Sequence, residues 1–164
     1  MHWVPAELHV SVERVATQLS DRDESLAVAE SCTGGLLGAV CTQPAGASRW
    51  FLGGIIAYAN AVKHAQLGIS LALIDQVGAV SEPVACQMAD GVRRRFDASY
   101  GIGITGIAGP EGGTPGKPVG LVWIATASRS GQDARAYQFS GDRDTVRQQA
   151  VAAALEQLLE CMRA

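Results

Sequence analysis

Three side chains that can act as nucleophiles, Ser31, Cys32 and Thr33, stand next to one another in the stretch AESCTGG. An apolar run ends just before them and two glycines follow. In open α/β sheets, ligands bind at the carboxyl ends of strands, where N–H groups of the next helix can hold an oxyanion or a phosphate. Ser31 is therefore a candidate nucleophile. The competing interpretation is that Ser31 and Thr33 only cap the helix, since both types are good N-caps.

A serine nucleophile needs a base that takes its proton. The elbow G-x-S-x-G is absent because Ala29 and Glu30 precede Ser31, and the dyad S-x-x-K fails at Gly34. The chain has only two lysines, and Lys63 follows the apolar segment GGIIAYA closely. A partly buried Lys63 would have a lowered pKa, and its neutral amine could take the serine proton. The alternative is a surface lysine on a short helix.

Further groups surround these two residues in the sequence. Tyr58 and Asn60 lie in the same segment as Lys63 and could relay protons or bind substrate.

Cys32 is a less favoured nucleophile. The four cysteines are far apart, with no C-x-x-C pair, which predicts neither a zinc site nor a disulfide framework. We expect no metal and no cofactor.

The long connection from Gly106 to Gly120 is rich in glycine and proline and far exceeds the length of a simple hairpin loop. Its N–H groups could form an anion-binding wall, with Thr105 at the end of the preceding strand. The other interpretation is a surface excursion. The letters GIGITG match G-x-G-x-x-G, but no helix can begin in the segment that follows, so close packing of a central strand is favoured over a dinucleotide site.

Two arginines, Arg143 and Arg147, lie one turn apart at the start of the last helix, where positive charge opposes the helix dipole. Asp142 and Asp144 could neutralise them. Alternatively, the arginines and the helix N-terminus bind a phosphate or carboxylate.

The surrounding pattern predicts helices that alternate with strands. Helices are expected at residues 6–20, from Thr33 through LLGAVCT, at 82–96 with Ser81 as N-cap, and from Arg143 onward. Strands are expected at SLAVAE, at IIAYA after a turn at Gly53 and Gly54, at YGIGIT, at GLVWIATA and, as an edge strand, at ARAYQFS. Several strands are apolar throughout, which favours a sheet covered on both faces. The expected fold is α/β: a single domain over residues 1–164, built as a three-layer α/β/α sandwich around a mostly parallel or mixed sheet.

Composition excludes several classes of function. The net charge is −3 with 18% charged residues, so the chain offers no basic surface for nucleic acid. No apolar run is long enough to span a membrane and the N-terminus lacks a signal-peptide pattern, which predicts a cytoplasmic protein. At 48% hydrophobic residues, some apolar surface is expected to lie in a homo-oligomer interface, most simply that of a dimer.

Five blocks together resemble the CinA C-terminal domain family, in order along the chain: AESCTGG, AYANAVKHAQLG, GAVSEPVA, GITGIAGPEGGTPGKPVGLVW and FSGDRDTVR. The resemblance implies a nicotinamide mononucleotide deamidase, which releases ammonia and nicotinate mononucleotide during recycling of the NAD pool.

For individual residues, the resemblance implies that Ser31 is the nucleophile, Lys63 its general base and Tyr58 a further catalytic group. The expected substrate-binding residues are Thr33, Gly34, Gly35, Asn60, Thr105, Gly106 and Arg143. Ala59 and Ala61 depart from the family's commoner Y-S-N-E, which removes a polar contact. A non-catalytic nucleotide-binding module of the same fold and an amidase with another substrate stay open as alternatives.

Overall fold

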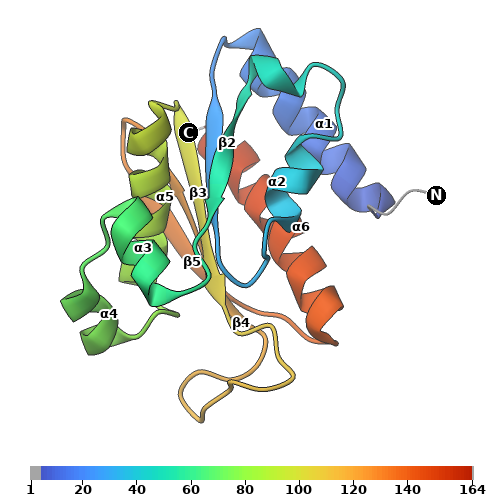
Figure 1. The fold of residues 1–164 in the computed structure, drawn as a ribbon. Coiled ribbons are helices and arrows are strands. Elements are labelled where there is room, and N and C mark those ends of the chain that lie inside the picture. The colour runs from blue at the N-terminus through green and yellow to red at the C-terminus, as the bar shows by residue number, and fades with distance from the viewer. Residues whose placement is uncertain (1–4, 164) are drawn as a thin grey trace.

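A computed structural model describes residues 5–163 as one five-stranded sheet with helices on both faces (Figure 1). In chain order the elements are α1 (Ala6–Asp21), β1 (Leu26–Glu30), α2 (Leu36–Cys41), a 3-10 turn (Ala47–Arg49), β2 (Phe51–Ile56), α3 (Asn60–Leu67), α4 (Leu71–Val77), α5 (Glu82–Phe96), β3 (Tyr100–Gly106), β4 (Leu121–Ala127), β5 (Gln132–Gln138) and α6 (Arg143–Cys161). The predicted three-layer α/β fold is confirmed. Among the described helices, none combines the length and apolar character needed to cross a bilayer.

The sheet is mixed, with the strand order β2-β1-β3-β4-β5. Strand β1 is parallel to both of its neighbours, while β4 and β5 pair antiparallel. From β1 the chain passes first to one side, to β2, and then to the other, to β3. This change of direction opens a crevice outside the carboxyl ends of β1 and β3, the usual place for a ligand in such sheets.

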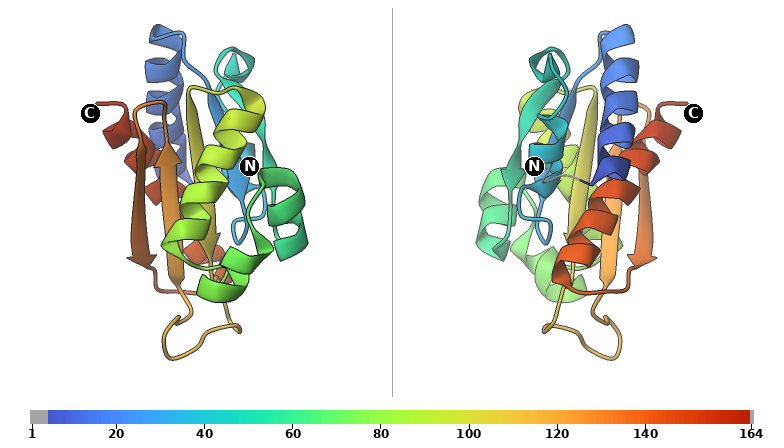
Figure 2. Two further views of the ribbon diagram at one scale, coloured as in Figure 1. Left: turned by 90° about the vertical axis from the view of Figure 1, so that its left-hand side faces the viewer. Right: turned by 90° about the vertical axis from the view of Figure 1, so that its right-hand side faces the viewer.

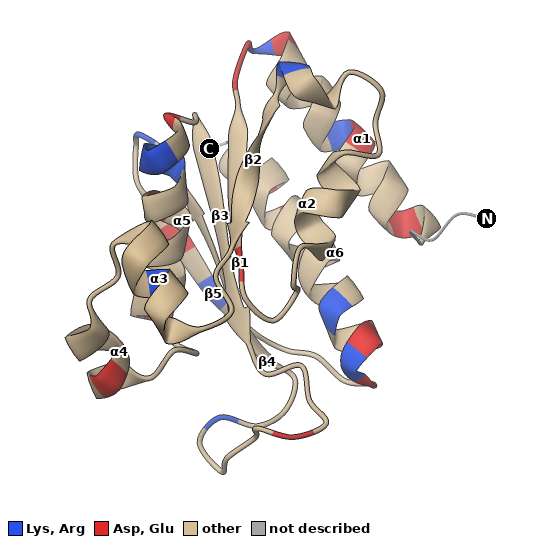
Figure 3. Cartoon of the chain, in the orientation of Figure 1, with Lys and Arg blue, Asp and Glu red and all other residues tan. Residues whose placement is uncertain are grey.

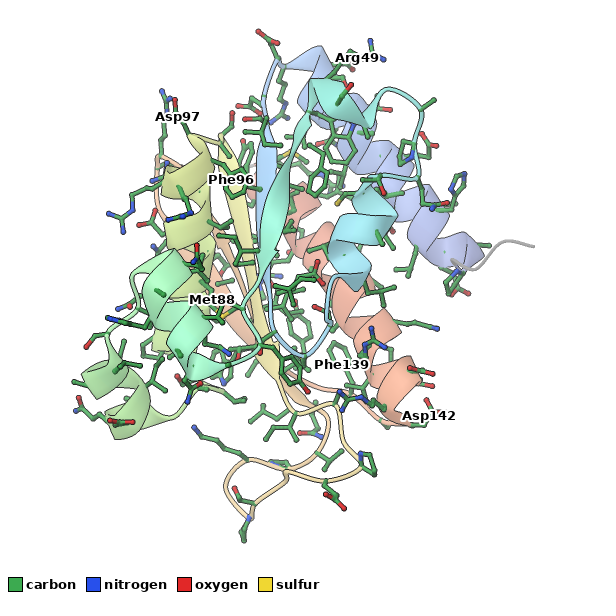
Figure 4. The ribbon with its side chains drawn as sticks, in the orientation of Figure 1. Arg49, Met88, Phe96, Asp97, Phe139 and Asp142 are labelled. Atoms are coloured by element: carbon green, nitrogen blue, oxygen red, sulfur yellow. The ribbon has the colours of Figure 1, made fainter. Side chains whose placement is uncertain are left out.

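Helices α1, α2 and α6 cover one face of the sheet, and α3, α4 and α5 cover the other, as the two side views show (Figure 2). Each layer encloses its own apolar cluster. Leu19, Leu37 and Leu155 are fully buried in the first. Ile69 and Met88 are fully buried in the second, with Met88 labelled in Figure 4. Burying such a side chain stabilises the fold by about 1.5–3 kcal/mol.

Local details differ from the predictions where tertiary packing intervenes. Gly53 and Gly54 lie inside β2, not in a turn before it. A Cβ on Gly54 would lie only 2.6 Å from the carbonyl oxygen of Val28 in β1, so the close approach of the two strands requires glycine at this position. Helix α2 begins at Leu36 instead of Thr33. Ser81 is the N-cap residue of α5, as predicted, but its hydroxyl donates to the Gly78 carbonyl oxygen and makes no hydrogen bond to the helix. Helix α4 was not predicted.

The GIGITG segment is a central strand, as the packing interpretation requires. A Cβ on Gly103 would lie 2.5 Å from the Ala85 carbonyl oxygen and 2.8 Å from the Met88 Cβ. Helix α5 therefore rests directly on the backbone of β3, and no helix follows the last glycine of the motif.

We expect Gly103→Ala to lower the free energy of unfolding by about 1–3 kcal/mol, because the added methyl group forces α5 away from the sheet. Urea denaturation followed by circular dichroism measures this. Gly116→Ala is the matched control, since a Cβ there meets no heavy atom within 4 Å, and its change should stay within about 0.5 kcal/mol. Equal stabilities of the two variants would contradict the close packing.

Candidate active site

A cavity of about 280 Å³ lies at the carboxyl ends of β1 and β3. Five parts of the chain line it: Ser31 and Cys32 after β1; Tyr58, Asn60 and Lys63 around the start of α3; Ala79 and Val80 before α5; Thr105 to Gly109, Glu111 and Gly112 from β3 and the following loop; and Arg143 of α6. The loop projects from this end of the molecule, and Asp142, labelled in Figure 4, marks the start of α6 beside it. The volume is near the lower end of the ~300–1,000 Å³ typical of ligand pockets, which favours a small molecule.

The side chains of Ser31 and Lys63 meet in this cavity. The Lys63 Nζ lies 3.1 Å from the Ser31 Oγ, 2.8 Å from the Ala57 carbonyl oxygen and 3.1 Å from the Tyr58 carbonyl oxygen. A helical side chain leans toward the N-terminus of its helix, which brings the amine of Lys63 back to Ala57 and Tyr58, ahead of α3. Lys63 is only 1% exposed, and this burial lowers the pKa of its ammonium group from the usual 10.5.

The three oxygens around the Lys63 Nζ can accept the three N–H groups of an ammonium, and they also suit the neutral amine that burial favours. A neutral lysine has two N–H donors and one lone pair. The two backbone carbonyls can take both N–H groups, which leaves the lone pair for the Ser31 hydroxyl. The arrangement can therefore draw the proton from Ser31 as a base does.

The thiol of Cys32 is poorly suited to be the nucleophile. It is 6% exposed, and burial raises its pKa to about 11, so the thiolate is disfavoured at neutral pH. The amine of Lys63 lies beside the Ser31 hydroxyl, whereas no described residue serves as a base for Cys32. Ser31 is therefore the better nucleophile of the two.

Of the two arginines at the start of α6, Arg143 lines the cavity and Arg147 does not. Arg143 donates to the Gly109 carbonyl oxygen at 2.8 Å and to the Tyr58 hydroxyl at 3.2 Å. Arg147 instead pairs with Asp144 at 3.3 Å and donates to the Thr33 carbonyl oxygen at 3.0 Å. Both signs of charge gather on these first turns of α6 (Figure 3). Neutralisation by an aspartate thus applies to Arg147, whereas the ion pairs of residues 5–163 leave Arg143 out.

Asp142 has another role. Its carboxylate accepts from the Thr145 backbone N–H at 2.8 Å and from the Thr145 hydroxyl at 2.6 Å, so it caps α6. These hydrogen bonds lower the pKa of Asp142. The cap leaves the guanidinium of Arg143 directed to the cavity side of the helix end.

The long loop forms a fixed wall of the cavity. Lys117 donates from its Nζ to the Val77 carbonyl oxygen at the end of α4, at 2.7 Å. Thr105 donates to the Ala79 carbonyl oxygen at 2.9 Å, which holds the segment before α5 against β3. The loop closes on itself through a bridge between Thr114 and Lys117.

Seven of the ten residues predicted for the site line the cavity: Ser31, Tyr58, Asn60, Lys63, Thr105, Gly106 and Arg143. Thr33, Gly34 and Gly35 do not. The Gly34 N–H donates to the Ser31 carbonyl oxygen and the Gly35 N–H to the Glu30 carboxylate.

Sequence reasoning missed Glu30, although an acid placed directly before a glycine-rich helix start is a recognisable signal for a cap. It also missed Ala79, Val80 and Glu111 as lining residues. Among residues 5–163, no group of three or more His, Cys, Asp or Glu side chains is arranged to hold a metal ion.

Comparison with known proteins shows which sequences and folds this chain is similar to. The family model described as CinA C-terminal domain matches residues 9–162. A CinA-like protein of Anaeromyxobacter dehalogenans (strain 2CP-C) is 51% identical over 149 residues, which is 91% of this chain and 36% of that protein. One from Gemmatimonas aurantiaca is 54% identical over 137 residues, or 84% of this chain and 32% of that protein. The chain thus spans about a third of the length of these curated relatives.

Solved structures resemble the whole fold. The competence/damage inducible protein CihA of Agrobacterium tumefaciens has a TM-score of 0.96 and 35% identity, with all of both chains covered. A CinA superfamily protein of Escherichia coli has a TM-score of 0.91 and 33% identity, with 98% of this chain and 94% of that chain covered.

Proposed function

Since the chain belongs to the CinA C-terminal domain family, we propose that it hydrolyses the carboxamide of nicotinamide mononucleotide to give nicotinate mononucleotide and ammonia. The observation that carries the proposal is the 3.1 Å contact between the Lys63 Nζ and the Ser31 Oγ inside the cavity. A buried amine beside a serine hydroxyl is a nucleophile with its base, which is the machinery of acyl transfer.

In the first half of the reaction, neutral Lys63 takes the hydroxyl proton of Ser31 while the Oγ bonds to the amide carbon. The carbonyl electron pair moves onto oxygen and gives a tetrahedral intermediate. The Lys63 ammonium then returns its proton to the amide nitrogen, the C–N bond breaks and ammonia leaves an acyl-Ser31 ester. In the second half, Lys63 takes a proton from water while the hydroxide bonds to the ester carbon. The C–O bond to Ser31 then breaks as the Lys63 ammonium returns its proton to the Oγ, and the carboxylic acid formed loses its proton to solvent as nicotinate mononucleotide leaves.

The phosphate of the substrate needs a second site, and Arg143 supports one. Its guanidinium reaches the cavity beside the N-terminus of α6 and bonds to the Tyr58 hydroxyl. The guanidinium of an arginine favours a phosphate because its planar set of N–H donors matches the phosphate oxygens. Tyr58 thus lies between the reacting centre, through its carbonyl bond to Lys63, and the proposed phosphate site.

The direct test is incubation of the purified protein with nicotinamide mononucleotide, with ammonia and nicotinate mononucleotide both quantified. We expect equal amounts of the two products, and no turnover in the Ser31→Ala variant. Binding of the nucleotide without turnover would refute the hydrolase and point to a nucleotide-binding module.

We expect Arg143→Ala to raise KM for nicotinamide mononucleotide roughly 10–100-fold, since a charge-assisted hydrogen bond to phosphate is worth about 1.5–3 kcal/mol. The rate with nicotinamide riboside, which lacks the phosphate, should change little. Steady-state kinetics on both substrates measure this. Arg14→Ala is the control, because Arg14 pairs with Glu156 away from the cavity. An equal loss with both substrates would argue against a phosphate role for Arg143.

A further inference from the structure

In the turn that follows Ser31, some backbone N–H groups donate hydrogen bonds within the described chain and others do not. The Ser31 N–H donates to the Ile104 carbonyl oxygen at 3.0 Å and continues the pairing of β1 with β3. The Gly34 and Leu36 N–H groups donate to the carbonyl oxygens of Ser31 and Thr33, both at 3.1 Å. For the N–H groups of Cys32 and Thr33, no other residue of the described chain provides an acceptor.

The carboxylate of Glu30 accepts hydrogen bonds from the backbone N–H groups of the next turn. This carboxylate is 1% exposed and accepts from the Gly35 N–H at 3.1 Å, the Leu37 N–H at 3.1 Å and the Gly38 N–H at 2.8 Å. The start of α2 is therefore already occupied by an anion of the protein itself. A substrate oxyanion cannot use those three amides while Glu30 holds them.

We infer that the backbone N–H of Cys32 is a donor of the oxyanion hole and that Glu30 is the positioning residue that holds its turn in place. This inference rests on the proposed acyl transfer at Ser31. Cys32 lines the cavity and directly follows the nucleophile, so its N–H lies next to the carbon that Ser31 attacks.

The two roles are complementary. When the Ser31 Oγ bonds to the acyl carbon, the carbonyl π electrons move onto oxygen, and the Cys32 N–H stabilises that charge before the C–N bond breaks. Glu30 does not contact the reacting atoms. It fixes residues 35–38 on one side of the turn, while the Gly34 bond to the Ser31 carbonyl fixes the other.

The test replaces single amide bonds by esters, which removes one N–H without changing a side chain. Cys41 allows a full-length chain to be assembled by ligating a synthetic peptide of residues 1–40 to residues 41–164. One ester is placed at Cys32 and, as control, another at Ala39, whose N–H donates to the Gly35 carbonyl oxygen at the start of α2. The all-amide ligated protein is the reference.

Two substrates keep the inference separate from the proposed function. Nicotinamide mononucleotide tests both, and p-nitrophenyl acetate tests acylation of Ser31 alone, with Ser31→Ala as its blank. We expect the Cys32 ester to lower kcat on either substrate roughly 10²–10³-fold with little change in KM, and the Ala39 ester to lower stability only. Full kcat in the Cys32 ester would overturn the inference. Activity on p-nitrophenyl acetate alone would overturn only the proposed substrate, and activity that survives Ser31→Ala would overturn both.

Glu30→Gln tests the positioning role, since it keeps the size but turns one acceptor into an NH₂ group that faces backbone donors. We expect kcat to fall by up to roughly 10²-fold, with KM and the pH at which the rate rises unchanged, because Lys63 is untouched. Gln157→Leu is the control: Gln157 is a buried side chain that bonds to Ile124 and Asp133 away from the cavity. A Glu30→Gln protein that loses stability as the control does but keeps its kcat would refute the positioning role.

Discussion

Replacing Lys63 by methionine is expected to lower the rate of nicotinamide mononucleotide hydrolysis by at least about 10³-fold, because the Ser31 hydroxyl loses the group that takes its proton. Methionine has a similar length and suits a buried site. The carbonyl oxygens of Ala57 and Tyr58 lose their donor, which costs about 1–3 kcal/mol of stability each. Circular dichroism and urea denaturation check that the variant is folded before its rate is compared.

The pH dependence identifies the base. Only the neutral amine accepts a proton, so kcat/KM of the wild type should rise with pH through the lowered pKa of Lys63 and level off above it. Residual activity of Lys63→Met should lack that rise. A variant whose pH profile overlays the wild type would exclude Lys63 as the base.

Stability should follow the same titration. The pKa of Lys63 is lower in the folded protein than the 10.5 of an ordinary lysine. Between these two values the unfolded chain binds a proton that the folded chain does not, so the free energy of unfolding rises with pH across that window. The difference between wild type and Lys63→Met, taken at about pH 7 and about pH 9.5, isolates this contribution from the buried cysteine thiols, which titrate with the opposite sign.

The second large effect is expected for Ser31→Ala, which should abolish turnover, with a loss of roughly 10⁴–10⁶-fold. The substrate should still bind, because the side chain removed contributes to bond formation and the phosphate site at Arg143 is intact. Calorimetric titration with nicotinamide mononucleotide should give a Kd within about threefold of the wild-type value. Trapped acyl-enzyme should be detectable by mass spectrometry on residue 31 of the wild type only.

Two companion variants sharpen this result. The double variant Ser31→Ala, Lys63→Met should be no slower than Ser31→Ala alone, since the two groups act as one unit. Cys32→Ala should keep its turnover, because burial holds the Cys32 thiol in its unreactive protonated form. Loss of turnover in Cys32→Ala with a normal fold would transfer the nucleophile to the thiol.

Much of the fold follows from local patterns. Each local pattern matches one element: the apolar stripe matches α1, the continuous apolar runs match β1 and β3, and the alternation matches β5. The predicted layers are therefore correct, and so is the position of Ser31 after a central strand. The errors concern features without a local signal. Gly53 and Gly54 read as a turn, yet both pair with β1, opposite Ala27 and Val28, and so belong to a strand. Helix α4 is too short for its period to stand out.

The sequence by itself determined which reactive and binding groups this protein has: a serine followed by a glycine-rich turn, two lysines, a long loop rich in glycine and proline, and arginines at a helix start. Only the tertiary structure decided which of these meet. It brings Ser31 and Lys63, thirty-two residues apart, to 3.1 Å, and buries the amine so that its neutral form is favoured. It assigns Arg143 to the cavity and Arg147 to Asp144, and it gives the helix-start amides to Glu30. Distance and burial depend on how separate segments pack, and no local pattern of residues contains either quantity.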